Sequence, residues 1–443
     1  MRIAIIGASH AGISAATEAK KRYPDAEIVL YEKKNQISFI SQNTLFYILD
    51  QDRLRLDSGQ YTTVVALRNA GYIVNTSVDV QSIDGKEHVL SYINLENGMS
   101  YTEHWDKLIM AIGSYPVLPI ILGPEPDNLF VLKDLKSALD LNRVVKKGKT
   151  AVIFGSGSIG VELARILKKR GLKVVLVEKH DKIMTHYFDH GASDQLEEIL
   201  KSEGIEVRKN EMAVSFEKAK KHIKTKTSSG EILTEIVIFS AGFRPNVALL
   251  RNQVEIGKSG AIKTDRFLQT SLKDVFAIGD CAETYCDLLD QGVYVPHASD
   301  ALRTGQIVIS NLIEPRKEIM SSEMTLSIDM DDLIIATTGI TFEKSVAAGY
   351  KAAQIFYHNA KVHKVGYNIW LTYDQETHKI LGAQFVGDVP NINSYVNSLS
   401  IAITNHMTTD EFADTDFYFE HGFQDVRGIQ RIIAALIYEK EER

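Results

Sequence analysis

Two segments of the chain repeat one succession of apolar and polar positions. In the first segment, a short apolar run leads into a turn at residues 7–12, then into a predicted helix and a second apolar run that ends before Glu32. The second segment keeps this order, with its turn at residues 155–160 and its second apolar run ending before Glu178. Unbroken apolar strands joined through a helix within about 30 residues are typical of the βαβ unit, whose helices cover both faces of a parallel sheet. The pattern therefore predicts two parallel-sheet domains.

The remaining apolar runs complete these sheets and start a third unit. Buried strands are predicted at residues 108–113, 236–242 and 275–280. A polar stretch, residues 79–103, alternates in short strands and predicts a small antiparallel layer. Farther along, strands at 368–373 and 381–386 alternate with helices near 394–405 and 428–438. The expected fold class is α/β, with two Rossmann-type domains plus a C-terminal α+β domain.

The second turn carries the full glycine pattern of a dinucleotide site. Gly155 permits the tight turn, Gly157 lets a pyrophosphate approach the backbone, and Gly160 lets the helix pack on the strand. The pyrophosphate then meets free N–H groups at the helix N-terminus. Glu178 can accept hydrogen bonds from both hydroxyls of an adenosine ribose and would repel a 2′-phosphate, which favours NAD over NADP. The two basic residues that follow it directly count against that preference.

The first turn departs from this pattern, because Ser9 stands where the second glycine is expected. Serine is the next smallest choice, so a phosphate can still approach closely. Glu32 follows Gly12 at about 20 residues, the spacing of a ribose-binding acid. The alternative interpretation is an ordinary strand-to-helix turn with a surface glutamate. The presence of a second matching turn in the same chain makes this alternative the weaker one. Two dinucleotide sites imply two dinucleotides, and a flavin with a nicotinamide is the economical pairing.

Composition narrows the class of protein. At 443 residues, 44% of them hydrophobic, the chain is long enough for about three globular domains. A net charge of −7 without a long basic tract argues against a nucleic-acid partner. No apolar run approaches the roughly 18 residues of a membrane span, so we expect no membrane partner. A strand is predicted at residues 2–6 with no signal-peptide pattern, so we expect a cytoplasmic location. Cys281 and Cys286 are too few for a disulfide framework and are expected to be free thiols.

Several further motifs resemble the pyridine nucleotide–disulfide oxidoreductases. Gly279-Asp280 is similar to the late Gly-Asp of that family, which reaches the ribityl chain of FAD. Four segments resemble in particular the branch of NADH oxidases, NADH peroxidases and coenzyme A–disulfide reductases: residues 7–12, 37–41, 296–299 and 336–340. The likeness extends over essentially the whole chain, and the motifs keep the family's order and spacing.

The resemblance implies FAD and NAD(H) as cofactors, no metal, and a homodimer whose aromatic segment 417–423 reaches the partner's flavin site. It implies an FAD-binding domain at residues 1–115 and 250–325, an NAD(H)-binding domain at 116–249 and a dimerisation domain at 326–443. The residues expected to contact FAD are Gly7, Ser9, His10, Ala11, Gly12, Glu32, Lys33, Ser41, Val80, Ala111, Gly113, Asp280 and Ala298. Those expected to contact NAD(H) are Gly155, Gly157, Ser158, Ile159, Gly160, Glu178 and Gly242.

One position departs from the branch in a way that concerns the chemistry. The residue after Ser41 is a redox cysteine in the branch, and in this chain it is Gln42. An amide cannot act as a nucleophile, form a sulfenic acid or exchange disulfides. Both cysteines lie far along the chain, so we do not expect either to replace this thiol. Ser158 is a second departure from the family, which often has at this position a tyrosine that shields the flavin. The alternative interpretation is that the serine is a neutral change at the helix N-terminus.

These features predict an FAD-dependent oxidoreductase that takes hydride from NADH and passes electrons to oxygen, giving hydrogen peroxide, or to a quinone or dye. His10 and Gln42 are the candidate catalytic positions. His10, kept neutral by the helix dipole, could protonate a leaving peroxide, and a packing histidine is the alternative. Two other functions stay open: a redox-sensing flavoprotein without efficient turnover, and an NADH-dependent reductase of an electron-transfer protein.

Overall fold

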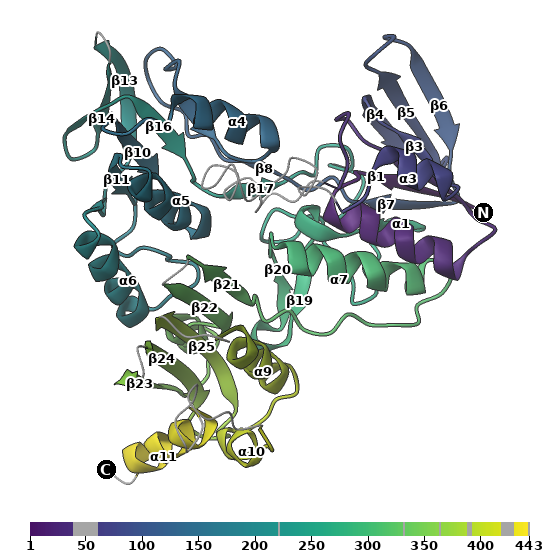
Figure 1. The fold of residues 1–443 in the computed structure, drawn as a ribbon. Coiled ribbons are helices and arrows are strands. Elements are labelled where there is room, and N and C mark those ends of the chain that lie inside the picture. Colours follow the sequence, from purple (N-terminus) through teal and green to yellow (C-terminus); the bar gives the residue numbers. More distant parts are fainter. Residues whose placement is uncertain are drawn as a thin grey trace.

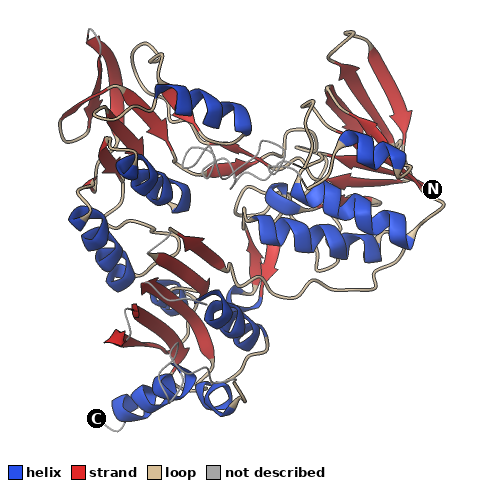
Figure 2. Ribbon diagram, viewed as in Figure 1, coloured by secondary structure: helices blue, strands red, loops and turns tan. Residues whose placement is uncertain are grey.

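The computed structural model describes residues 1–38, 61–219, 222–330, 333–362, 365–387, 392–417 and 429–441. In this part of the chain, three five-stranded sheets form the centres of three α/β or α+β units (Figures 1 and 2). Two of the sheets are parallel and the third is antiparallel, as the alternation of apolar runs and helices predicts. Within the described residues, no helix is long and apolar enough to cross a membrane.

The first parallel sheet contains the N-terminal strand. Its strands, in spatial order, are β18 (Val275–Ala277), β7 (Lys107–Met110), β1 (Arg2–Ile6), β2 (Glu27–Tyr31) and β3 (Ile73–Asn75). The helices α1 (His10–Arg22) and α7 (Ala298–Val308) pack on one face. The other face packs against a three-stranded antiparallel layer of β4 (Val78–Asp84), β5 (Val89–Asn94) and β6 (Ser100–His104). This layer confirms the strands predicted for residues 79–103. A short helix, α3 (Val64–Asn69), precedes β3.

The second parallel sheet repeats the first. Its strands, in spatial order, are β12 (Glu206–Arg208), β11 (Lys173–Val177), β10 (Thr150–Phe154), β16 (Ile236–Phe239) and β9 (Leu129–Val131). One face carries the helices α4 (Leu135–Val144), α5 (Ser158–Lys169) and α6 (His190–Ser202). The other face packs against β13 (Ala213–Ala219), β14 (His222–Thr227) and β15 (Glu231–Thr234). Two antiparallel segments, β8 (Ser114–Pro116) and β17 (Phe243–Pro245), join the two units.

Three strands are shorter than their apolar runs predict. β7, β16 and β18 end at Met110, Phe239 and Ala277, before the predicted ends at residues 113, 242 and 280. Each of the three runs contains a glycine with positive φ past the strand end: 67° at Gly113, 94° at Gly242 and 63° at Gly279. A positive φ is incompatible with an extended strand, so the backbone turns even though the side chains stay apolar.

The C-terminal unit has an antiparallel sheet covered by helices. Its strands are β21 (Leu326–Asp329), β22 (Ile334–Gly339), β25 (Ile380–Gly387), β24 (Val365–Asp374) and β23 (Ala352–Val362). Its helices are α8 (Phe342–Ala347), α9 (Ile392–Thr404), α10 (Thr409–Asp414) and α11 (Ile429–Glu441). The predicted strands at 368–373 and 381–386 lie within β24 and β25, and the helices predicted near 394–405 and 428–438 overlap α9 and α11. The three domain boundaries drawn from the sequence stay a prediction.

Asp189 joins the second sheet's unit to the C-terminal unit. It is the N-cap residue of α6, and its side chain is 6% exposed. Its carboxylate accepts hydrogen bonds from the backbone of Phe342 at 2.9 Å and from Nε2 of Gln354 at 3.0 Å, and also from Nε2 of Gln384. Gln384 returns a bond by accepting from the Asp189 backbone N–H at 2.8 Å. One buried charge therefore satisfies donors from α8, β23 and β25.

We predict that Asp189→Ala lowers the free energy of unfolding by about 3 kcal/mol, because buried donors of the C-terminal unit lose their acceptor. Urea unfolding of the cofactor-loaded protein, followed by circular dichroism, measures this loss. Asp194→Ala is the matched control on the same helix, since the Asp194 side chain is 57% exposed and lies 4.0 Å from Lys209. Equal effects of the two substitutions would contradict the role given to Asp189.

Candidate functional site

The two predicted glycine turns adopt the same backbone geometry. Gly7 has φ of 102°, and a Cβ there would lie 2.2 Å from the Ala111 carbonyl oxygen. Gly155 has φ of 105°, and a Cβ there would lie 2.3 Å from the Ser240 carbonyl oxygen. Each turn therefore presses against the end of a neighbouring strand, and only glycine permits both the conformation and the contact. Gly12 and Gly160 are equally confined, because their own Cβ atoms would clash with the carbonyl oxygens of the first glycines.

A glutamate at the end of the second strand holds each turn in place. Glu32 accepts the Ala8 N–H through Oε2 and the Lys34 N–H through Oε1, each at 2.9 Å. Glu178 accepts through Oε2 from the Ser156 N–H at 3.0 Å and the Ser156 hydroxyl at 2.6 Å. The two acids, predicted as ribose ligands, thus also bond the second residue of their own glycine turn.

The helix N-terminus that follows each turn is suited to a phosphate. The first turns of α1 and α5 contain no acidic side chain, and their N-cap residues, Ser9 and Gly157, make no side-chain capping bond. A Cβ at Gly157 would meet no described atom within 4 Å, so the space in front of this turn is open. Free N–H groups, a positive helix end and an open cradle fit the pyrophosphate of a dinucleotide.

Asp280 lies where the first unit approaches the second. It follows β18 in a short 3₁₀ turn, and its carboxylate accepts from the Ser114 hydroxyl at 2.9 Å. Burial raises the pKa of Asp280, against the opposing effects of Ser114 and Lys133. Burial also lowers the pKa of Lys133 to about 8, although Asp280 acts in the other direction. Hydroxyls of a ribityl chain fit this polar, buried position.

Lys133 is a site residue that sequence reasoning missed. It lies between β9 and α4, and its ammonium nitrogen is 5.4 Å from the centre of the Phe243 ring. Its charge faces Asp280. In the sequence, the whole of the second unit's sheet after β9 lies between these two residues. An isolated lysine before a helix carries no local signal of such a contact, so only long-range packing identifies it.

His10 is the one predicted catalytic residue that the structure describes. Its ring stacks on Tyr61 with a centroid separation of 5.9 Å and an interplanar angle of 14°. Its Nε2 atom is buried and has no hydrogen-bond partner among the described residues. Burial lowers the pKa of His10, so the ring is neutral at pH 7. A neutral ring with an unpaired nitrogen is open to a ligand. Ser41 and Gln42 lie outside the described residues.

Most of the other predicted residues lie just after a parallel strand or at the start of a helix. Ala111 and Gly113 follow β7, Gly242 follows β16, and Ala298 begins α7. Ala11 lies in the first turn of α1, and Ser158 and Ile159 open α5; Val80 lies in β4. Lys33 instead extends outward, where its ammonium group bonds the Asp79 carboxylate at 2.8 Å. That contact holds the exposed Lys33 side chain against β4.

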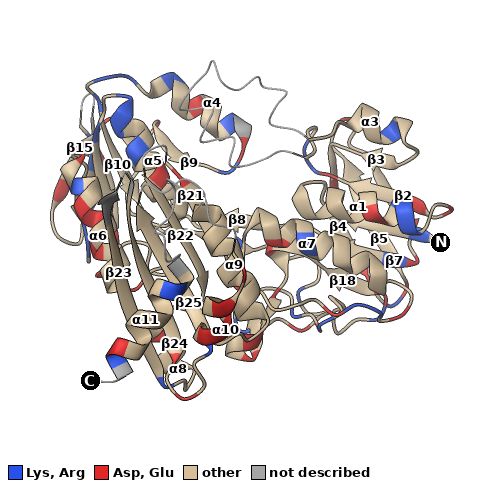
Figure 3. Cartoon of the chain, turned by 60° about the horizontal axis from the view of Figure 1, so that its bottom comes forward, with Lys and Arg blue, Asp and Glu red and all other residues tan. Residues whose placement is uncertain are grey.

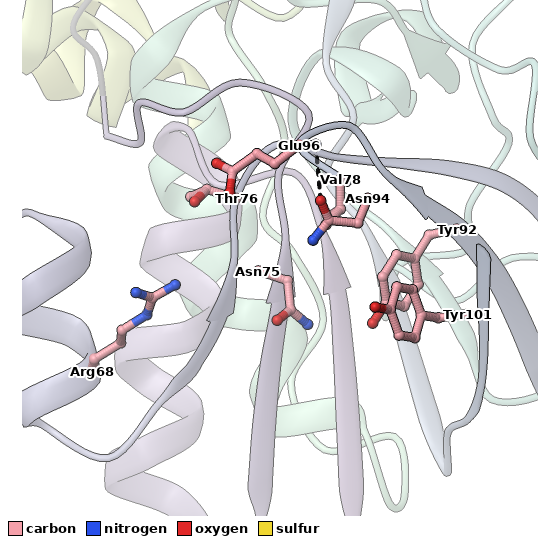
Figure 4. A pocket seen from close by; sticks show the side chains of 8 residues that line it. All are labelled: Arg68, Asn75, Thr76, Val78, Tyr92, Asn94, Glu96 and Tyr101. Atoms are coloured by element: carbon pink, nitrogen blue, oxygen red, sulfur yellow. Dashed lines mark hydrogen bonds between the residues drawn. The ribbon is translucent and has the colours of Figure 1, made fainter. Parts of the chain in front are cut away.

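A polar cleft of about 410 Å³ adjoins the first glycine turn (Figure 4). Its lining residues are Arg68, Asn75, Thr76, Val78, Tyr92, Asn94, Glu96 and Tyr101. Figure 4 shows the rings of Tyr92 and Tyr101 facing each other, with centroids 5.3 Å apart. The Asn75 carbonyl accepts the Glu32 N–H at 2.8 Å, which places the cleft beside the strand-end acid. The glycine turns do not line it, so the cleft borders the candidate site and does not form it.

The two cysteines are buried and unreactive in this fold. Cys281 and Cys286 are free thiols with fully buried side chains. Burial raises the pKa of each thiol to about 11. Cys281 also donates its S–H to the carbonyl oxygens of Met110 and Ile278, each at 3.3 Å. Since the thiolate is the nucleophile, neither residue is suited to redox exchange at neutral pH.

Comparison with known proteins places this arrangement in a family. Residues 1–305 match the model described as "Pyridine nucleotide-disulphide oxidoreductase", and residues 330–419 match the dimerisation domain of the same family. An NADH oxidase of Enterococcus faecalis is 30% identical over 430 residues, which cover 96% of each chain. A CoA-dependent NAD(P)H sulfur oxidoreductase of Pyrococcus furiosus is 29% identical, again over 96% of each chain.

A solved structure of similar sequence has the same fold. The water-forming NADH oxidase of Lactobacillus brevis, bound to NADH, superposes with a TM-score of 0.95 at 29% identity, covering 99% of this chain and 98% of that one. The family binds FAD and NAD(P)H, and the two glycine turns described above fit both. This chain therefore belongs to the pyridine nucleotide–disulphide oxidoreductase family and is an NAD(P)H-dependent flavin oxidoreductase of the NADH oxidase-like kind.

Proposed function

We propose that this protein is a homodimeric FAD enzyme that oxidises NADH and transfers the electrons to oxygen, forming hydrogen peroxide, or to a quinone or dye. The observation that carries the proposal is the pair of equivalent glycine turns, each held by a strand-end glutamate, on two parallel sheets of one chain. When bound, FAD supplies the two-electron redox chemistry that amino-acid side chains lack. The contribution of the chain is to bind and orient the two dinucleotides.

The first turn is assigned to FAD and the second to NADH. Gly7–Gly12 with Glu32 would hold the flavin's adenosine half, and Asp280 with Lys133 would hold its ribityl and phosphate region. At the second turn, Glu178 is kept ionised, because bonds from Ser156 and His180 outweigh the effect of its burial and lower its pKa. A buried carboxylate at this position accepts ribose hydroxyls and repels a 2′-phosphate, which supports NADH over NADPH.

The choice of acceptor rests on the lack of a usable thiol. The family resemblance places Gln42 where the branch has its redox cysteine, and an amide cannot reduce a peroxide. Cys281 and Cys286 are buried thiols whose raised pKa disfavours the thiolate. The balanced reaction is then NADH + H⁺ + O₂ → NAD⁺ + H₂O₂. His10 is neutral and its Nε2 has no partner among the described residues, which supports a role in donating a hydrogen bond to the departing peroxide.

Other acceptors in related proteins do not alter this choice. The Lactobacillus brevis relative is described as water-forming, and the Pyrococcus furiosus relative as CoA-dependent. Both activities need a further reduction or a thiol partner. At the position where the branch has its redox cysteine, this chain has Gln42, which cannot supply either. A reductase of an electron-transfer protein would need a docking face of one charge. In the part of the chain that Figure 3 colours, acidic and basic residues are interspersed along the elements.

The homodimer is assigned to the antiparallel-sheet unit. Large apolar side chains on three of its elements are exposed: Phe356 on β23 at 53%, Ile401 on α9 at 63% and Tyr438 on α11 at 51%. Exposed apolar side chains of this size favour burial against a second copy. Of the aromatic segment expected to reach the partner, Phe417 is described and packs on Phe412 with ring centres 5.4 Å apart. Residues 418–423 lie outside the described residues.

The proposed reaction predicts one hydrogen peroxide per NADH oxidised. Addition of catalase should therefore return half of the oxygen that the enzyme consumes, as measured with an oxygen electrode. The double variant Cys281→Ala, Cys286→Ala should give the same yield, since neither buried thiol takes part. A peroxide yield near zero, with two NADH oxidised for each oxygen, would overturn the proposal.

Gln42→Cys should divert the product from peroxide to water, because a thiol beside the flavin can be oxidised by peroxide and then reduced. The measurement is the peroxide yield per NADH in wild type, Gln42→Cys and Gln42→Ser, with serine as the control that has a similar size and no thiol. An unchanged peroxide yield in Gln42→Cys would argue against the assignment of position 42 to the redox centre.

Glu178→Gln should reduce discrimination between NADH and NADPH about tenfold, because the repulsion of a 2′-phosphate is lost. The ratio of the two dissociation constants, measured by titration calorimetry on the holoenzyme, reports this change. Glu206→Gln on neighbouring strand β12 is the control, since its side chain is 55% exposed and pairs with Arg208. Retained discrimination in Glu178→Gln would assign coenzyme choice to other residues.

A further inference from the structure

Tyr187 and His297 meet where three parts of the chain come together. Tyr187 lies between β11 and α6, and His297 directly precedes α7. The Tyr187 hydroxyl and Nε2 of His297 are 3.2 Å apart, and the two rings stack with centroids separated by 5.9 Å at 22°. A backbone hydrogen bond also joins His297 to Thr325, just before β21. The imidazole therefore contacts segments that lead into all three sheets.

His297 is a buried histidine that keeps a neutral ring. Burial lowers the pKa of His297, against the opposing effects of Asp300, Asp280 and the Thr325 backbone, so the ring is neutral at pH 7. A neutral imidazole has one N–H and one acceptor nitrogen. The Thr325 backbone acts to raise the pKa of His297. The Tyr187 hydroxyl can bond Nε2 in either tautomer of the ring, because a hydroxyl both donates and accepts.

Tyr187 is tied to the second glycine turn, and the helix that follows His297 is tied to the turn that contains Asp280. The Tyr187 N–H bonds the Met184 carbonyl at 2.8 Å, and the Met184 N–H bonds the Ser156 carbonyl at 3.1 Å. Ser156 is the residue of the second glycine turn that Glu178 holds. On the other side, Thr304 of α7 accepts the Gly279 N–H at 3.1 Å, next to Asp280 of the flavin region. Hydrogen bonds thus connect Tyr187 to the second glycine turn, and α7 connects His297 to the short turn at Gly279–Cys281.

We propose that the hydrogen bond between Tyr187 and His297 is a latch that sets the nicotinamide turn at the correct distance and angle from the flavin. Tyr187 and His297 are positioning residues: they orient one dinucleotide relative to the other and donate nothing to the reaction. The proposal rests on the proposed function, in which NADH binds at the second turn and FAD at the first. It predicts that loss of this hydrogen bond slows hydride transfer. The affinity of the second glycine turn, with Glu178, for the adenosine half of NADH should be unchanged.

Four variants of the FAD-loaded full chain test the latch. Tyr187→Phe keeps the ring and removes the hydroxyl, and His297→Leu removes the imidazole nitrogens. His297→Gln restores a side chain with both a donor and an acceptor. Tyr350→Phe is the matched control, because it also removes a bonded hydroxyl, 3.0 Å from the Leu288 carbonyl oxygen, at a distance from both glycine turns in the sequence and fold. FAD content and thermal unfolding establish that each variant is folded.

Two measurements separate positioning from a structural role. The first is the rate constant for anaerobic flavin reduction by NADH in stopped flow, which should fall about fivefold in Tyr187→Phe and His297→Leu, as expected from the loss of one hydrogen bond. The second is titration of the oxidised holoenzyme with NAD⁺. In the same two variants the dissociation constant of NAD⁺ should stay within twofold of wild type, and the change that NAD⁺ causes in the flavin spectrum should be smaller. His297→Gln should recover most of both signals, and Tyr350→Phe should match wild type.

Wild-type rates and spectra in Tyr187→Phe and His297→Leu would overturn the latch. A raised dissociation constant with an unchanged rate would also overturn it, because the pair would then be a binding contact. Failure of wild type to be reduced by NADH would instead overturn the proposed function, and the NAD⁺-induced spectral change would still decide the latch.

Discussion

The hydrogen bonds from a strand-end glutamate to the adjacent glycine turn hold both nucleotide sites in shape. Gly7 and Gly155 take positive φ and touch a neighbouring strand, so neither position can carry a packing side chain. An open cradle also leaves backbone N–H groups in need of acceptors. Glu32 and Glu178 supply these acceptors, and bonds to a charged group contribute more than neutral ones. Glu32 and Glu178 are also the predicted ribose ligands, so in the proposed function one group both supports the turn and recognises the dinucleotide.

The segment between β11 and α6 connects the second glycine turn to the other two units through hydrogen bonds. It begins with Glu178 bonded to Ser156, continues with Tyr187 on His297, and ends with Asp189 bonded to α8, β23 and β25. Three contacts within a few residues therefore relate the nicotinamide turn to the other two units. A displacement of this segment would change all three contacts together, and in our proposal this segment sets the relative placement of the two dinucleotides.

The chemistry available at the site is limited by burial. Desolvation disfavours charge, so it keeps His10 and His297 neutral and the thiols of Cys281 and Cys286 protonated. With Gln42 in the position that the resemblance assigns to a cysteine, the chain offers no group among its described residues that is suited to accept electrons itself. In the proposed function, its part in catalysis is to position the dinucleotides and to exclude water, and the acceptor is decided by what reaches the flavin.

The sequence by itself determined the elements whose signal is local. Glycines at fixed spacing, an acid after the next apolar run and unbroken apolar strands predicted both glycine turns, because each depends on residues close together in the chain. It overestimated the lengths of β7, β16 and β18, since apolar side chains continue past the point where a glycine turns the backbone. Only the tertiary structure decided that Lys133 faces Asp280 and that Tyr187 bonds His297. These pairs come from separate units, and their contact depends on how whole sheets pack, a property that no local pattern encodes.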